Sequence, residues 1–168
     1  MATLRTRGDA PGRLVSMIQR VSPDGLADPA RLLCDFNAEY DDPAPPPDQV
    51  AARLGELVEG GQVVVLLARD DEGAPVGVAV MRVQPSVFSR AQEAYLAELY
   101  VVPSRRGQGF GRELITEALG VARDRGADYA FLITSEEDRL AQRLYEAAGF
   151  RRTEGEGGPL MLAYERDL

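Results

Sequence analysis

The chain has 168 residues, enough for one domain of ordinary size, with a net charge of −8 and a single cysteine, Cys34. It has no histidine and no lysine, which excludes Ser–His and Cys–His nucleophilic pairs, Cys/His zinc sites, lysine Schiff bases and Walker-type phosphate loops. The acidic balance argues against binding to nucleic acid or to an anionic membrane and favours a cationic partner, although solubility alone would also account for it.

The N-terminal residues 1–5 lack the apolar core of a secretory signal, and the longest apolar run, residues 63–68, is too short to span a bilayer. A single cysteine cannot form an internal disulfide, which is compatible with a reducing compartment. These features predict a cytoplasmic protein that does not bind membranes.

Helical and turn patterns dominate the first 60 residues. Residues 4–7 fit a short opening strand, and Asp9 precedes a predicted helix. A second helix is expected over residues 30–40, followed by an acidic and then proline-rich loop. Asp48 is the expected N-cap of a third helix, which ends at Gly60 and Gly61. The apolar residues that recur at helical spacing in the first helix are Leu14, Met17, Ile18 and Val21.

The apolar period then changes from helical to strand-like. Residues 62–68 and 76–83 are rich in Val and Leu with a polar turn between them, which predicts a hairpin. A third apolar run covers residues 95–102. A glycine-rich loop, an amphipathic helix, a strand over 129–134, another helix and a last strand pair around 151–164 follow. This order predicts a mixed sheet with helices on both faces, in one domain over residues 1–168.

The most informative segment is the glycine-rich loop at residues 102–112, which lies between a predicted strand and a predicted helix. Such a turn points unpaired backbone N–H groups outward at the positive end of the helix dipole. Glycines at 107, 109 and 111 lack the Cβ atoms that would keep a diphosphate away from the backbone, and Arg105, Arg106 and Arg112 add positive charge. The spacing differs from the dinucleotide-binding fingerprint, and a purely structural role of the glycines is the alternative.

Two blocks of the sequence resemble the GNAT acetyltransferase superfamily, which transfers acetyl from acetyl-CoA. The loop pattern Arg/Gln-x-x-Gly-x-Gly/Ala of that family matches residues 106–111, and residues 99–103 resemble the strand that leads to the loop. A second block matches over residues 141–150, Ala-Gln-Arg-Leu-Tyr-Glu-Ala-Ala-Gly-Phe. The resemblance implies an α/β fold of the α+β type, with a mixed, mostly antiparallel central sheet and helices on both faces.

By this resemblance acetyl-CoA is the cosubstrate, and no metal cofactor is expected. The family often has Asn where this chain has Asp138, a position that contacts the pantetheine arm. A compatible alternative is that residues 135–138 cap the following helix, with Ser135 as N-cap. The residues expected to bind the cofactor are Tyr100, Val101, Val102, Arg105, Arg106, Gly107, Gln108, Gly109, Phe110, Gly111, Arg112 and Asp138.

Two side chains are candidates for proton transfer. Glu98 lies within an apolar strand, where a carboxylate is unfavourable unless it is paired or functional, and we expect it to act as general base. The alternative is a Glu on a solvated face or paired with an Arg. Tyr145 follows Asp138 by seven residues on one helical face and is the candidate acid for the departing thiolate, with a packing role as the alternative. By resemblance, a backbone N–H within residues 100–102 polarises the thioester carbonyl.

The resemblance places the acceptor beside the N-terminal helices. Phe36, Glu39, Tyr40 and Asp41 combine aromatic and carboxylate groups that suit an ammonium group, and a solvated loop is the alternative explanation of the charges. We expect an N-acetyltransferase that acts on a primary amine of a small molecule or peptide by direct attack in a ternary complex, as a monomer or homodimer. A non-catalytic acyl-CoA-binding sensor and another phosphate binder are the rival interpretations.

Overall fold

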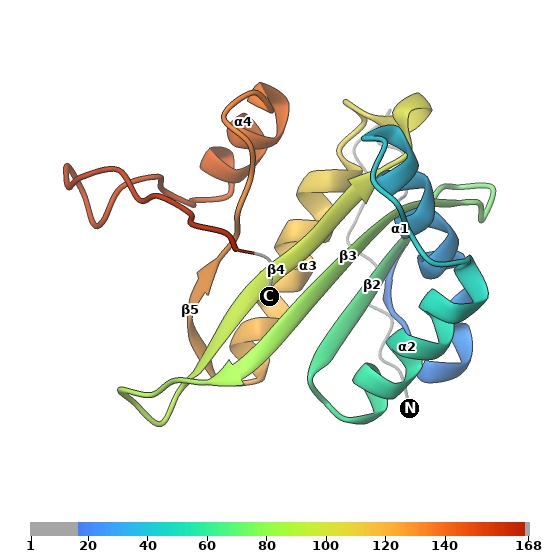
Figure 1. Cartoon of the computed structure of the whole chain (residues 1–168), viewed down its shortest axis with the longest axis horizontal. Helices are drawn as coiled ribbons and strands as arrows, with labels where there is room; N and C mark the ends of the chain where they lie inside the picture. Colours follow the sequence, from blue (N-terminus) through green and yellow to red (C-terminus); the bar gives the residue numbers. More distant parts are fainter. Residues whose placement is uncertain (1–16, 167–168) are drawn as a thin grey trace.

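The computed structural model describes residues 17–166. Five strands form one sheet, with helices between and after them in the described part of the chain (Figure 1). The elements in chain order are β1 (Met17–Arg20), the short 3-10 helix η1 (Pro23–Gly25), α1 (Ala27–Glu39), α2 (Pro47–Glu59), β2 (Val63–Arg69), β3 (Pro75–Pro85), β4 (Gln92–Val101), the 3-10 helix η2 (Pro103–Arg105), α3 (Phe110–Asp124), β5 (Ala127–Phe131) and α4 (Arg139–Ala147).

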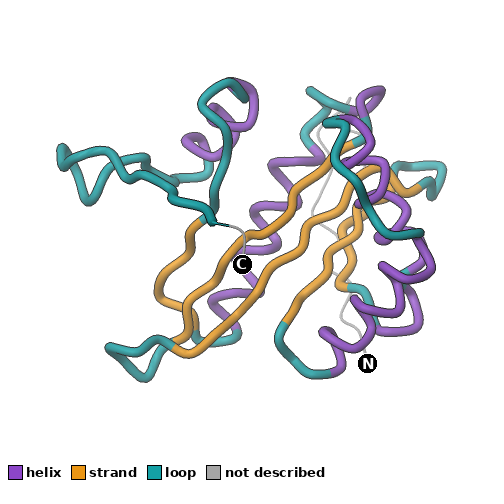
Figure 2. The backbone as a smooth tube through the Cα atoms, viewed as in Figure 1, coloured by secondary structure: helices purple, strands orange, loops and turns teal. Residues whose placement is uncertain are grey.

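The sheet is covered on both faces, as Figure 2 shows for the strands between the helices. Val64, Leu66 and Ala68 of β2 pack in a core with Phe110 and Leu114 of α3. The alternate β2 residues, among them Val65, lie in a second core with side chains from α1 and α2. A strand that is buried on both faces is a continuous apolar run, which explains the composition of residues 63–68. The predicted mixed sheet with helices on both faces is confirmed.

The strand order is β1-β2-β3-β4-β5, and all neighbours are antiparallel except β4 and β5. The parallel β4–β5 pairing runs from Gln92↔Ala127 to Tyr95↔Phe131 and then stops, while β4 continues to Val101. Figure 1 places α4 and the end of α1 on opposite sides of this last part of β4. Within the described residues, one edge of β4 is therefore left without a strand partner in the part of the sheet that lies between these helices.

The helix predicted around Ile18 and Val21 is wrong for residues 17–20, which form the edge strand β1 against β2. Ile18 packs against the core under α3, whereas Val21 is buried in the core under α1 and α2. Side chains that serve opposite faces of a sheet mimic helical spacing over so short a segment. The strand predicted at residues 4–7 lies outside the described residues.

Three other expectations need correction. Asp48 is not an N-cap, because α2 already begins at Pro47, whose fixed φ suits the first helical position. The fifth strand covers Ala127–Phe131 rather than residues 129–134. Beyond α4, the described residues contain one isolated bridge, Thr153↔Leu160, in place of the predicted strand pair. Leu160 and the apolar residues after it are exposed, so no second layer of described residues stabilises them.

The helices predicted over residues 30–40 and before Gly60 are confirmed by α1 and α2. The predicted hairpin is β2–β3, and the strand predicted over residues 95–102 is part of β4. Within residues 17–166, no helix has the length and apolar character needed to cross a membrane.

Candidate active site

A β-bulge in β4 decides which way Glu98 points. Val80 of β3 pairs with Glu98 but the next residue, Met81, pairs with Leu96, so Ala97 is the extra residue. Leu96 belongs to the core under α3, whereas Tyr100 belongs to the core under α1 and α2. Since side chains alternate along a strand, the bulge moves Glu98 from the face of Leu96 to the face of Tyr100.

On this face Glu98 lines a pocket of about 170 Å³ between β4, α1 and the loop before α2. Its carboxylate is half-buried and forms no ion pair within residues 17–166. Burial raises the pKa of Glu98, and the charge of Arg82 opposes that shift. A carboxylate with these properties is a stronger base than an exposed glutamate. The other residues that line the pocket are Leu33, Cys34, Asn37, Ala44, Pro45 and Val50.

Tyr145 lies on α4, across from Glu98. Its half-buried ring packs edge-on against Phe150, with 6.2 Å between the ring centroids. Burial raises the pKa of Tyr145 to about 12, and the charges of Asp138 and Glu98 add to the shift. The hydroxyl therefore keeps its proton at neutral pH, and Glu98 is close enough to influence it electrostatically.

Asp138 caps α4, and its Oδ1 accepts a hydrogen bond from the backbone N–H of Ala141 at 2.9 Å. The N-cap of α4 is therefore Asp138, three residues after Ser135, the N-cap that the alternative prediction gave. The Ser135 Oγ accepts instead from the N–H of Glu137 at 3.1 Å, in the turn before the helix. Contact of Asp138 with a cofactor stays a prediction.

The backbone of β4 offers an N–H group beside these side chains. Val102 donates its N–H to the Val76 carbonyl at 2.9 Å, so N–H groups of even-numbered residues face β3 in this part of the strand. The N–H of Val101 therefore points to the other edge, where the pairing with β5 has ended. Of the predicted residues 100–102, Val101 has the geometry for polarising a carbonyl group.

The glycine-rich loop ends in the N-terminus of α3. Gly107 and Gly109 have φ values of 76° and 102°, in the left-handed region that favours glycine. No described residue accepts a hydrogen bond from the backbone N–H groups of residues 107–112, and the first N–H to be bonded is that of Glu113, to the Gly109 carbonyl at 3.1 Å. A Cβ at Gly109 would meet none of the described atoms within 4 Å. The arrangement suits an anion that lies against the backbone.

The arginines of the loop differ in their partners. Arg105 donates to the buried carboxylate of Asp70 at 2.7 Å, and Arg106 donates to both carboxylate oxygens of Glu39. Arg112 forms no ion pair with the described part of the chain. Its guanidinium is therefore available for a ligand at the start of α3.

Three other predicted cofactor residues have a structural contact. The Phe110 side chain is buried in the core, so only its backbone can contact a ligand. A Cβ on Gly111 would lie 3.0 Å from Leu144 Cδ2, which shows that this glycine lets α4 approach α3. Gln108 donates from its side chain to the Ser104 carbonyl at 3.2 Å and stabilises the loop.

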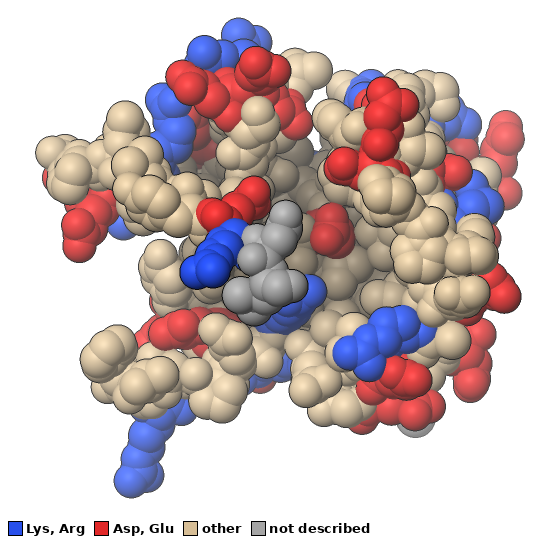
Figure 3. Space-filling view, viewed as in Figure 1, with Lys and Arg blue, Asp and Glu red and all other residues tan. Residues whose placement is uncertain are grey.

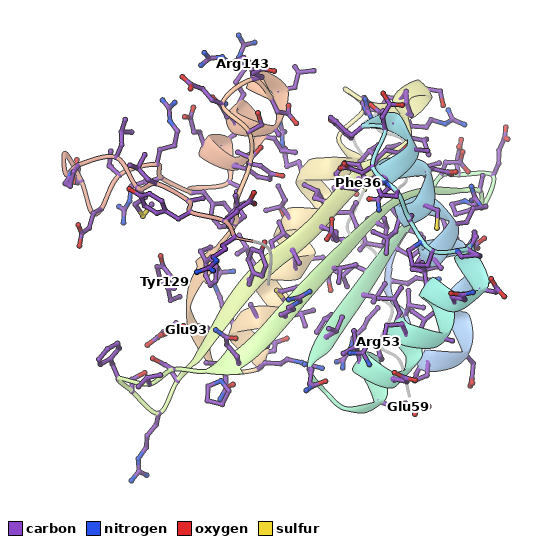
Figure 4. The ribbon with its side chains drawn as sticks, viewed as in Figure 1. Phe36, Arg53, Glu59, Glu93, Tyr129 and Arg143 are labelled. Carbon is purple, nitrogen blue, oxygen red and sulfur yellow. The ribbon has the colours of Figure 1, made fainter. Side chains whose placement is uncertain are left out.

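The residues predicted for the acceptor gather at the end of α1. Phe36 points from α1 toward β4 (Figure 4), and its ring centroid lies 5.4 Å from that of Tyr100 and 5.4 Å from that of Tyr40. Tyr40 and Asp41 are exposed. Figure 3 shows acidic side chains on both sides of a hollow in this face of the molecule. Glu39 lies here too, but Arg106 occupies its carboxylate.

Sequence reasoning missed Asn37, whose side chain lines the pocket with Glu98. A signal was present, because Asn37 follows Leu33 by one helical turn and is a polar residue on the apolar side of a predicted helix. The bulge at Ala97 had no such signal, since no glycine or proline marks it.

Comparisons with known proteins agree with the geometry. The model of the acetyltransferase (GNAT) family matches residues 30–150. An N-acetyltransferase of Archaeoglobus fulgidus is 35% identical over 101 residues, which cover 55% of this chain and 69% of that protein. The thialysine N-epsilon-acetyltransferase of Bos taurus is 34% identical over 90 residues, so the match covers 51% of this chain and about half (53%) of the bovine enzyme.

A crystal structure from Arthrobacter sp. FB24, designated an acetyltransferase, superposes with a TM-score of 0.82 and 40% identity. The match covers 96% of this chain and 100% of that one. The chain therefore belongs to the GNAT acetyltransferase family.

Proposed function

We propose that this protein transfers the acetyl group of acetyl-CoA to a primary amine of a small molecule or peptide by direct attack in a ternary complex. The observation that carries the proposal is the convergence of three groups where β4 and β5 diverge. These are the half-buried carboxylate of Glu98, the protonated hydroxyl of Tyr145 and the outward-pointing N–H of Val101.

The glycine-rich loop is proposed to hold the diphosphate of the cosubstrate. The N–H groups of residues 107–112 and the positive end of the α3 dipole attract a diphosphate, and the Arg112 guanidinium adds positive charge. Gly109 leaves open space at its Cα, so a phosphate oxygen can lie against the backbone. The bound cosubstrate supplies a thioester whose acetyl carbon forms the new C–N bond while its C–S bond breaks.

Each of the three converging groups has one task in this reaction. The ammonium group first loses one proton to solvent, which frees the nitrogen lone pair for attack. Glu98 accepts the second proton, which the nitrogen loses as the C–N bond forms, directly or through one water molecule. The Val101 N–H donates a hydrogen bond to the carbonyl oxygen as negative charge develops on it. Tyr145 donates its proton to the departing sulfur, and one proton from Glu98 or solvent restores the hydroxyl. Because its pKa is raised, the Tyr145 hydroxyl stays protonated until the thiolate forms.

The acceptor is proposed to be a cationic amine that enters the Glu98 pocket. Phe36 and Tyr40 form an aromatic pair at the end of α1 that would attract an ammonium group, and Asn37, which lines the pocket, would offer hydrogen bonds. The bovine relative is named for acetylation at a side-chain amine, which is a group of this kind. A cytoplasmic location and a monomeric or homodimeric state are part of the same proposal.

The test is thiol release from acetyl-CoA with a panel of amines that contains thialysine, sisomicin, spermidine and short peptides. The expected result is turnover of at least one cationic amine, with the acetylated product seen by mass spectrometry. Tight binding of CoA without turnover of any amine would instead favour the acyl-CoA sensor.

A further inference from the structure

Arg106, within the predicted cofactor loop, donates hydrogen bonds from all three nitrogens of its guanidinium group to other parts of the fold. Its two terminal nitrogens donate to the two carboxylate oxygens of Glu39 at 2.7 and 2.6 Å, and its Nε donates to the Val101 carbonyl at 2.9 Å. The guanidinium carbon also lies 5.7 Å from the centroid of the Tyr100 ring. The loop, the end of β4 and the end of α1 are thus joined through one side chain.

The geometry and position of the Arg106–Glu39 pair distinguish it from an ordinary surface ion pair. A two-pronged arginine–carboxylate pair fixes orientation as well as distance. Glu39 is the last residue of α1, where the helix dipole disfavours a carboxylate, and the Arg106 charge offsets this. The hydrogen bond from Arg106 lowers the pKa of Glu39 below its usual range. The carboxylate is therefore charged, and the pair is formed, at neutral pH.

The pair is one of two anchors that tie the loop to different elements of the fold. Arg105 ties the start of the loop to Asp70, which also accepts the Ala74 N–H at 2.8 Å in the turn between β2 and β3. Arg106 ties the next residue to α1. Between these anchors and α3, Gly107 and Gly109 leave the backbone few restraints of its own.

We propose that Arg106 and Glu39 form a clamp that positions the cofactor loop against α1, so that Arg106 is a positioning residue and not a phosphate ligand. The proposal rests on the proposed function, because the positioned loop is the one assigned to the diphosphate of acetyl-CoA. The clamp also joins the loop to the helix that carries Phe36, one of the aromatic residues proposed for the acceptor.

When Glu39 is neutralised, the clamp predicts weaker CoA binding, whereas simple electrostatics predicts stronger CoA binding. CoA is an anion, so the loss of a nearby carboxylate and the release of Arg106 would strengthen CoA binding if charge alone mattered. If Glu39 instead preorganises the loop, its loss adds an ordering cost to binding and weakens it. Glu39→Gln therefore separates the two explanations by the direction of the change in Kd.

The experiment measures CoA binding by isothermal titration calorimetry. The expected result is a Kd that rises about fivefold in Glu39→Gln and in Arg106→Gln, and no further in the double variant, because either change opens the same clamp. Arg106→Lys keeps the charge but lacks the planar fork, and its Kd is expected to rise as in Arg106→Gln. The matched control is Asp35→Asn, which removes another α1 carboxylate, one that pairs with Arg31, and is expected to leave Kd unchanged.

An unchanged or lower Kd in Glu39→Gln would overturn the clamp, as would wild-type affinity in Arg106→Lys. Circular dichroism and thermal unfolding of each variant without ligand show that a changed Kd does not reflect loss of the fold. Lack of CoA binding by the wild-type protein would reject the proposed function and the clamp together. CoA binding that strengthens in Glu39→Gln would reject the clamp alone.

Discussion

At the scale of single residues, the site combines two groups, Glu98 and Tyr145, whose surroundings raise their pKa values. Burial raises the pKa of the Glu98 carboxyl and makes it a better base, while burial and nearby carboxylates raise the pKa of the Tyr145 hydroxyl to about 12. The two side chains are buried by different surroundings, Glu98 in the pocket beside α1 and Tyr145 against Phe150 and the core under α3. One group can therefore take a proton while the other still has one to give.

Tyr145→Phe tests the proposed acid at this scale. Loss of the hydroxyl is expected to lower kcat about 10- to 100-fold, because the thiolate then departs without a proton donor, and to change the Kd of acetyl-CoA less than twofold. Steady-state kinetics and calorimetry measure the two quantities. Tyr129→Phe is the control, since Tyr129 is an exposed tyrosine on β5 (Figure 4). A variant that keeps kcat within twofold and only unfolds more easily would assign Tyr145 to packing.

At the scale of elements, Leu144 and Tyr145 of α4 pack against the core that α3 covers. Gly111 lets Leu144, the neighbour of Tyr145, approach α3 closely. Gly120 lies on the same helix, but a Cβ added there would meet none of the described atoms within 4 Å. A methyl group at Gly111 requires the Leu144 side chain on α4 to shift by a few tenths of an ångström, but one at Gly120 fits without any shift.

The two glycines therefore predict different outcomes for the same change. Gly120→Ala is expected to raise the free energy of unfolding by about 0.5–1 kcal/mol and to leave kcat unchanged, because alanine favours the helix. Gly111→Ala is expected to lower kcat several-fold despite the same gain in helix propensity. Chemical denaturation and kinetics give both values. Equal kcat in the two variants would show that the α3–α4 contact does not control the site.

Elements also show what sequence could and could not predict. The β2–β3 hairpin, β4, α1 and the glycine-rich loop were predictable, because each is long or has a strong local pattern. β1 was mistaken for a helix since its apolar residues serve opposite faces of the sheet. Glu98 could be singled out as a carboxylate in an apolar strand. Its face could not, because that depends on a bulge at Ala97 which only the pairing with β3 defines.

The contact between Glu39 and Arg106 could not be predicted from the sequence either. Each was expected to touch a different ligand, and 67 positions separate them in the sequence. Their pairing depends on the packing of α1 against β4, a long-range feature that local patterns do not encode. The capping role of Asp138, by contrast, lay within reach of local rules, although the helix begins later than expected.

At the scale of the whole molecule, charge separates the two ends of the proposed reaction. The net charge is −8, acidic side chains flank the hollow on the face seen in Figure 3, and the N–H groups of residues 107–112 form a local positive site. A cationic acceptor is attracted by the overall field, and the anionic cosubstrate by the loop alone.

This separation of charge predicts that kcat/KM for a cationic acceptor depends on ionic strength. For the cationic amine that the panel identifies, kcat/KM is expected to fall about three- to tenfold between about 0.02 and 0.2 M salt, because screening weakens long-range attraction. An acceptor with the same amine but no net charge serves as the control and is expected to change less than twofold. A kcat/KM that does not depend on salt for the cationic acceptor would assign the acidic surface to solubility alone.

The most direct test of the central claim is the pH dependence of kcat/KM in the wild-type protein and in Glu98→Gln. The proposed base, Glu98, would act only when deprotonated, so wild-type kcat/KM is expected to lose a factor of about ten per pH unit below the raised pKa of Glu98, in addition to any titration of the acceptor amine. Glu98→Gln is expected to be slower and to lack this extra slope, while Glu93→Gln on the same strand keeps it. At neutral pH the variant is also expected to be more stable than the wild type, since a raised folded-state pKa means that the buried charge opposes folding above that pKa. An acidic limb of the same slope in Glu98→Gln would contradict the assignment of Glu98 as the base.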